Sequence, residues 1–376
     1  MQVYLQELKR SGNLDGLSKS GLSNADRELL TKILEDGLVE ESLAMLEELD
    51  VEGDWETIHR RLNAEKTRVL PMRSLWKYAA IFIGLISLGI ALNQSLAPGE
   101  HPIPEDMITL EIGNDVKPII GDEKQAIVLP SGQVVAVKEG NTLKYDPGYT
   151  EEPLFNELHI PHGKMFTLVL SDGTQVELNS GTHIRYPVKF SKEGAREISM
   201  SGEAYFKVSK DQKRPFIVKS GGMAIEVLGT EFNVSAYEEE HTISTVLVEG
   251  SVSLSQVSDS KNKLLLKPGH KGSWNRSEHT LSLDRVDDTQ LYTSWLQGEI
   301  VFRDTPFSEL LIKLERFYNV EIVNHNKELE GVAFDARYNR EVESIEEVMT
   351  ALQIIVPFEY TVKTKTGGNI KEINIE

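Results

Sequence analysis

Apolar positions recur at helical spacing through the first 74 residues. Ser23 and Asp26 form a capping-box pattern at the start of the first periodic segment. The apolar stripes of the three helices predicted from this spacing are Leu29, Leu30 and Ile33, then Val39, Leu43 and Leu46, and finally Trp55, Ile58 and Leu62. Because short helices can only just cover one core, residues 1–74 are expected to form a small helical module.

The next stretch carries no charge. From Tyr78 to Gly99 there are 22 uncharged residues, which at helical rise reach about 33 Å, enough for a hydrocarbon core of about 30 Å. The bases that precede it are Arg60, Arg61, Lys66, Arg68, Arg73 and Lys77, and no Lys or Arg follows until after Val116. The positive-inside rule then predicts one transmembrane helix at residues 75–97, with residues 1–74 in the cytoplasm. A buried helix of a soluble protein is the alternative, because Asn93 and Gln94 weaken the apolar run.

Short alternating strands begin after a proline-containing linker at residues 98–116. Among them, Ile127–Tyr145 aligns with Leu168–Tyr186 at an offset of 41 residues, with six of nineteen positions identical. Each copy reads as three strands separated by two glycine turns. This repeat predicts an all-β domain at residues 117–256, either a solenoid or a sandwich.

Strands and helices alternate at residues 290–376. Thr305 and Pro306 are expected to cap and open a helix, and Ser344 and Glu347 form a second capping-box pattern. The order β-α-β-β-α-β-β predicts a small α+β domain, which adds a final strand to the β-α-β-β-α-β type. The expected fold class is therefore multidomain: a helical N-terminal module, one transmembrane helix, an all-β domain and a C-terminal α+β domain.

The amino-acid composition excludes some classes of function. The chain has 59 acidic and 40 basic residues, a net charge of -19 and no cysteine. Disulfides and thiol chemistry are excluded, and direct binding of nucleic acid is disfavoured because phosphates require cationic surface. Ten acids and no Lys or Arg lie between Ile33 and His59, which suits a basic protein partner. The alternative is that these acids are only solvated.

Catalytic motifs are weak. His159 and His162 have a possible ligand spacing, but no acid nearby completes a metal set, so neither a metal nor a cofactor is expected. No G-x-S-x-G, P-loop or G-x-G-x-x-G pattern occurs in the right context. At Gly229–Thr230 the hydroxyl could attack the preceding carbonyl carbon, giving a single self-cleavage. A glycine bulge in a strand is the simpler interpretation.

The sequence resembles the FecR family of membrane anti-sigma factors, as found in Bacteroidetes-type bacteria. The matching stretches are NELHIPHGKMFTLVLSDGTQVELNSGTHIRYP, ISMSGEAYFKVSKDQKRPFIV, IEVLGTEFNVSAY and VLVEGSVSL. The run WLQGEIVFRDTPFSELLIKLERFYNVEI is similar to the start of the C-terminal domain usually paired with that family, itself like the short N-terminal domain of secretins and TonB-dependent transducers.

This resemblance implies a relay between two membranes. The protein would lie in the bacterial inner membrane as a single-pass protein, with most of the chain in the periplasm. There it would receive a signal from the signalling domain of a TonB-dependent transporter, in the regulation of iron or glycan uptake. Its N-terminal module would hold an extracytoplasmic-function sigma factor until a membrane protease cuts the anchor. Some family members cleave themselves at a Gly-Thr in the position of Gly229–Thr230.

The candidate sigma-binding residues are Glu40, Leu43, Leu46, Glu47, Glu48 and Trp55. The competing interpretation is that Leu43, Leu46 and Trp55 hold the module's own core. Two other functional classes stay open: a membrane-anchored periplasmic scaffold or assembly protein with a secretin-like interaction domain, and an anchored self-processing or hydrolytic enzyme.

Overall fold

The structure is a computed structural model that describes residues 2–12, 23–48, 59, 104, 106–113, 115–121, 123–129, 131–148, 154–365 and 370–376. The chain divides into two compact units, Met1–Glu100 and His101–Glu376. Each unit has hydrophobic clusters of its own, one in the first unit and two in the second.

The first unit contains three short helices, which we call the helical module: α1 (Gln2–Ser11), α2 (Asn24–Glu35) and α3 (Val39–Glu48). The predicted capping box is confirmed, because the Asp26 amide donates to the Ser23 hydroxyl and the Asp26 carboxylate accepts from the Ser23 amide. Leu5, Leu8, Leu30 and Leu43 are buried between the helices. Leu5 and Leu8 lie three residues apart on one face of α1, and Leu30 and Leu43 come from α2 and α3, so all three helices contribute to the core.

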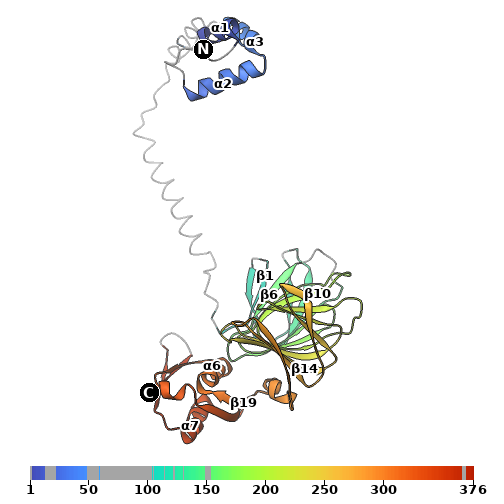
Figure 1. The fold of residues 1–376 in the computed structure, drawn as a ribbon, viewed down its shortest axis with the longest axis vertical. Helices are drawn as coiled ribbons and strands as arrows, with labels where there is room; N and C mark the ends of the chain where they lie inside the picture. The colour runs from blue at the N-terminus through green and yellow to red at the C-terminus, as the bar shows by residue number, and fades with distance from the viewer. Residues whose placement is uncertain are drawn as a thin grey trace, which may run out of the picture. The chain divides into compact units, whose positions relative to one another are not determined.

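The second unit begins with a large curled sheet, shown in Figure 1 from cyan to yellow, which we call the sheet domain (residues 109–285). Eighteen strands belong to it. They are β1 (Thr109–Ile112), β2 (Asp115–Pro118), β3 (Gln125–Val128), β4 (Val134–Glu139), β5 (Thr142–Tyr145), β6 (Phe155–His159), β7 (Phe166–Val169), β8 (Gln175–Leu178), β9 (His183–Pro187), β10 (Arg196–Lys207), β11 (Phe216–Ser220), β12 (Met223–Val227), β13 (Glu231–Ala236), β14 (Thr242–Glu249), β15 (Val252–Gln256), β16 (Asp259–Leu266), β17 (His270–Asn275) and β18 (Thr280–Arg285).

The long strand β10 lets the sheet curl. Its first part pairs with β9 and β11, and its second part pairs with β8 and β13. One strand therefore takes different neighbours along its length, and the apolar faces on either side enclose a single hydrophobic core.

The 41-residue repeat recurs in the structure as β3–β4–β5 and β7–β8–β9. The equivalent residues Tyr145 and Tyr186 meet in the core, where their hydroxyls lie 3.0 Å apart and their rings pack edge to face. β5 pairs in parallel with β7. The two copies thus pack against each other.

The C-terminal domain (residues 299–376) contains β19 (Glu299–Pro306), α6 (Phe307–Tyr318), β20 (Val320–Asn324), β21 (Ala333–Asn339), α7 (Ile345–Ile355), β22 (Tyr360–Thr364) and β23 (Lys371–Ile375). β19 pairs with β21, and β20, β23 and β22 form a second sheet. Three short 3-10 helices, η1 (Thr289–Tyr292), η2 (Ser294–Gln297) and η3 (Lys327–Leu329), complete the unit. The capping box of Ser344 and Glu347 is confirmed, whereas Thr305 lies in β19 and Pro306 stands at the helix cap without a side-chain bond.

The fold class expected from the sequence is wrong. The described chain is mostly β, with one large curled sheet in place of a solenoid or sandwich and five helices of only 10 to 12 residues. Alternation specifies which residues form strands but not which strands pair, so it could not distinguish these architectures. Within the C-terminal domain, the element order β-α-β-β-α-β-β is the one that its pattern predicts.

None of the helices in the described ranges is both long and apolar enough to cross a bilayer. The expected span at residues 75–97 lies outside the described residues, as do Trp55 and the flanking bases Arg60, Arg61, Lys66, Arg68, Arg73 and Lys77. Strand β1 falls within the expected linker at 98–116, and β16 to β18 continue the sheet beyond residue 256.

Candidate functional site

The acidic candidates for sigma binding lie on α3. The side chain of Glu40 is 78% exposed and its carboxylate lies 3.0 Å from the ammonium of Lys9. Glu48 is also exposed, and Glu47 belongs to the same helix. Exposed pairs of this kind contribute little stability, so these carboxylates can exchange partners at low cost.

The apolar candidates lie differently. Leu43 is only 8% exposed and belongs to the core of the helical module, while Leu46 packs against that core partly buried. The two leucines therefore belong to the helical module's own core, whereas Glu40 and Glu48 are exposed on its surface.

Gly229 and Thr230 lie in the bend that connects β12 to β13. Gly229 has a φ of +146°, and a Cβ there would lie 2.8 Å from the Cα of Lys210, so glycine is required by both conformation and space. Thr230 is 5% exposed, and its hydroxyl donates to the Ser251 carbonyl at 3.0 Å. The dipeptide therefore lies in a closely packed bend between two strands, not in a bulge within a strand.

Arg316 joins the C-terminal domain to the sheet domain. Its side chain is 8% exposed, and its guanidinium lies 3.6 Å from the ring centroid of Tyr237. It donates to the carboxylates of Glu239 and Glu240, the latter at 2.6 Å. Both carboxylates follow β13 directly in sequence, so one short loop supplies the ring and both acceptors.

A second contact lies beside it. The amide of Gly163 donates to the Arg316 carbonyl at 2.8 Å, and Arg340 donates to the Gly163 carbonyl at 3.2 Å. A Cβ on Gly163 would lie 2.9 Å from the Cβ of Asn319, so only glycine permits this approach. The hydrophobic clusters of the two domains share no residue. The junction is thus held by charged and backbone hydrogen bonds.

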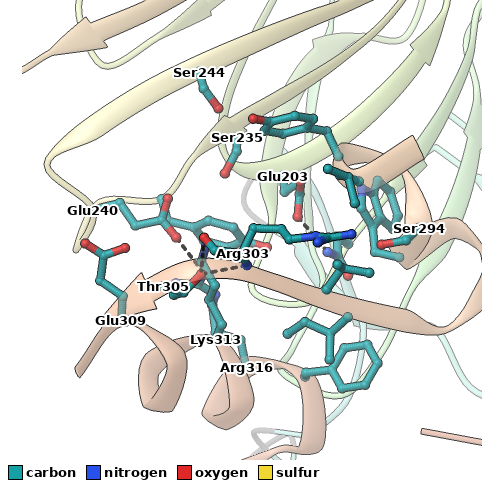
Figure 2. A pocket seen from close by; sticks show the side chains of 18 of the residues that line it. Glu203, Ser235, Glu240, Ser244, Ser294, Arg303, Thr305, Glu309, Lys313 and Arg316 are labelled. Atoms are coloured by element: carbon teal, nitrogen blue, oxygen red, sulfur yellow. Dashed lines mark hydrogen bonds and ion pairs between the residues drawn. The ribbon is translucent and has the colours of Figure 1, made fainter. Parts of the chain in front are cut away.

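Next to this junction is a cavity of about 460 Å³, part of which Figure 2 shows. Glu203 lines it, and its carboxylate accepts from the amides of Asn179 at 2.8 Å and Asn233 at 2.9 Å. Burial raises the pKa of Glu203, although those two hydrogen bonds act in the opposite direction. Trp295 of η2 donates to the side-chain oxygen of Asn233 at 3.2 Å and fixes its orientation.

The histidines considered as metal ligands do not converge. His159 instead stacks on His183, with ring centroids 4.0 Å apart, and desolvation lowers the pKa of His159 to about 4. Across the residues that the structure describes, no three His, Asp or Glu side chains are placed to hold a metal ion.

Sequence reasoning missed the junction and the cavity. The three glutamates that directly follow Tyr237 could have indicated that a basic side chain of the same chain binds there. Nothing in the spacing indicated that this partner is Arg316, which is more than seventy residues away.

Comparisons with known proteins agree with this architecture. The family model described as FecR protein matches residues 156–253, and the model described as FecR, C-terminal matches residues 299–367. A crystal structure of a candidate anti-sigma factor from Parabacteroides distasonis is similar at 31% identity and a TM-score of 0.51, with 58% of this chain and 98% of that chain covered. The chain belongs to the FecR family.

A second crystal structure of a candidate anti-sigma factor from the same organism has the same identity and TM-score, and covers 59% of this FecR-family chain and 99% of its own. The curated proteins contain no match. Family membership makes the chain an anti-sigma-factor-like regulator rather than an enzyme. FecR proteins are typically membrane-associated, and the family points to a sigma factor as partner.

Proposed function

We propose that residues 1–74 sequester an extracytoplasmic-function sigma factor, and that residues 101–376 receive the signal that ends this sequestration. The observation that carries the proposal is the exposed acidic helix α3, which packs on a hydrophobic core shared by α1, α2 and α3.

The charge of α3 suits such a partner. Glu40, Glu41 and Glu48 are exposed, and α3 contains no basic residue. A sigma factor presents cationic surfaces to DNA, and carboxylates placed opposite those surfaces compete with phosphate for the same contacts. Leu43 and Leu46 support this face from within the module.

The location we propose is the bacterial inner membrane, crossed once by residues 75–97, with residues 1–74 in the cytoplasm and the bulk of the chain in the periplasm. The supporting pattern is the cluster of bases ending at Lys77 and the absence of Lys and Arg from Tyr78 to Val116. Reporter fusions at residues 74 and 101 test this topology: alkaline phosphatase should be active only in the second position.

We further propose that the periplasmic signal comes from the signalling domain of a TonB-dependent transporter, and that a membrane protease then releases the sigma factor. The resemblance of the C-terminal domain to the short domain of such transducers supports the first step. The polar junction around Arg316 supports a relay, because polar interfaces between domains permit relative motion more readily than hydrophobic ones.

Reversing charge on α3 should weaken sigma binding. The double variant Glu40→Lys, Glu48→Lys is expected to lose about tenfold to a hundredfold in affinity for the sigma factor, because two favourable contacts become repulsive. Isothermal titration of residues 1–74 with the partner sigma factor measures this.

The matched control is Glu7→Lys, Glu28→Lys, which changes net charge equally at exposed sites on α1 and α2. Equal losses in both variants would assign the effect to net charge, and unchanged affinity in the α3 variant would remove α3 from the contact.

For Gly229–Thr230 we propose one self-cleavage per chain. The Thr230 Oγ1 attacks the Gly229 carbonyl carbon, the peptide C–N bond breaks, and the hydroxyl proton passes to the new amine; water then hydrolyses the ester. The positive φ of Gly229, which glycine adopts readily, and the fixed Thr230 hydroxyl support this step.

Intact mass spectrometry of denatured residues 101–376 tests the cleavage. Two fragments that divide between residues 229 and 230 are expected, whereas Thr230→Ala should give one chain and Thr230→Ser two. A single chain in the native protein after prolonged incubation would show that the turn is only structural.

A further inference from the structure

The cavity beside the junction has one wall made by a straight row of side chains across the sheet. Glu203 on β10 lies opposite Ser235 on β13, which lies opposite Ser244 on β14, which in turn lies opposite Ser273 on β17. All four line the cavity. Neighbouring strands lie about 4.8 Å apart, so the row presents one polar group at each regular step perpendicular to the strands.

The hydroxyls of this row are available to a ligand. Within the described part of the chain, Ser235, Ser244 and Ser273 have no side-chain hydrogen bond, and each is only partly buried. A serine hydroxyl can donate one hydrogen bond and accept two. Partly buried hydroxyls without partners retain that capacity in the cavity.

The carboxylate at the end of the row is held in a fixed orientation. Both oxygens of Glu203 accept a hydrogen bond from an amide, and the donor Asn233 is itself fixed by Trp295. No cation lies within ion-pair distance of Glu203 in the described ranges. A carboxylate held in this way retains lone pairs that can accept from hydroxyl groups of a ligand.

The opposite wall comes from the C-terminal domain and the segment before it. Figure 2 shows Arg303 on β19 and Glu309 and Lys313 on α6 facing the row, and none of these three side chains has an ion-pair partner in the described residues. Tyr292 adds an aromatic face, with the Lys271 ammonium 5.5 Å from its ring centroid. The lining therefore mixes hydrogen-bond donors, acceptors and aromatic rings, with acids and bases in nearly equal number.

We propose that this cavity binds a linear oligosaccharide, laid across the strands along the serine row and covered by the C-terminal domain. Successive sugar units present hydroxyl groups at a regular repeat, which matches a row of hydroxyls and a carboxylate at strand spacing. The lining also contains apolar and aromatic side chains, among them Ile300, Trp295 and Phe317, which suit the apolar faces of sugar rings, whereas a strongly anionic ligand meets Glu203.

This site goes beyond the proposed function, because it makes the FecR-family chain itself a receptor. The ligand contacts both domains next to Arg316, so binding stabilises the arrangement in which the junction is closed. Sigma binding by residues 1–74 is measured separately, so failure of either proposal leaves the other intact.

Residues 101–376, which form a compact unit with their own cores, provide the material for the test. They are applied to an array of linear oligosaccharides of four to eight sugars that includes cellulose-, starch-, xylan- and chitin-derived chains, and hits are titrated calorimetrically. Binding with a Kd below the millimolar range is expected for at least one chain type. Absence of binding to every member of the array at millimolar concentration overturns the proposal.

Substitutions locate the binding site. The double variant Ser244→Val, Ser273→Val should lose at least tenfold in affinity with an unchanged melting temperature, and Glu203→Gln should lose affinity by itself. Ser282→Val is the matched control, because Ser282 lies opposite Ser273 on β18 but does not line the cavity. Wild-type affinity in the double variant, or an equal loss in the control, overturns the assignment to the serine row.

Discussion

Replacing Arg196 by alanine is expected to destabilise the sheet domain by about 3–5 kcal/mol, since it leaves a buried carboxylate without its cation. The Arg196 side chain is 1% exposed, and its guanidinium lies 2.6 Å from the carboxylate of Asp172, which is 5% exposed. The same guanidinium donates to the carbonyls of Ser209 and Arg214 at 3.0 and 3.1 Å. One side chain therefore ties the β7–β8 turn to the loop after β10.

Denaturant unfolding of residues 101–376, followed by circular dichroism, measures this loss. Arg185→Ala is the control, because Arg185 pairs with Glu157 at 3.0 Å while both side chains are about half exposed. That pair should contribute less than about 1 kcal/mol. Similar losses in the two variants would mean that burial does not govern the Arg196 contact.

Replacing Arg316 by alanine is expected to open the junction while each domain stays folded. The substitution removes the contact with the Tyr237 ring and leaves Glu239 and Glu240 without their cation. We expect a loss of about 2–4 kcal/mol in docking free energy, since charge-assisted bonds are strong but both carboxylates retain access to water.

Two observables report on the opened junction. Acrylamide should quench Trp295 fluorescence more strongly, because Trp295 is buried at the junction with Asn233, and limited proteolysis should cut between residues 285 and 299. Lys313→Ala removes a charge from the same helix without removing a described ion pair and should change neither readout. An unchanged quenching constant in Arg316→Ala would show that other contacts suffice to hold the domains.

The sequence predicted local features well. Both capping boxes formed, because each needs only two side chains three residues apart. The stripe from Phe307 to Phe317 is buried as its spacing indicates, and the 41-residue repeat became two copies of three strands. Family membership was also recognisable from sequence, since the matching stretches lie in the sheet and C-terminal domains.

The sequence predicted structural roles less well where the same residue pattern fits two different roles. Leu43 was a candidate for sigma binding and is a core residue of the helical module, because an amphipathic stripe does not say whether it faces its own module or a partner. Likewise, Gly229 suggested a bulge within a strand, whereas it lies in the bend between β12 and β13, packed closely against Lys210.

By itself, the sequence determined the helices, the hairpin units and the charge pattern, because these depend on residues a few positions apart. Only the tertiary structure decided the curled sheet, the Arg316 junction and the serine row. Ser235, Ser244 and Ser273 are ordinary alternating positions on three separate strands, and they become one row only through strand register. Register depends on the packing of the whole sheet, which no local spacing specifies.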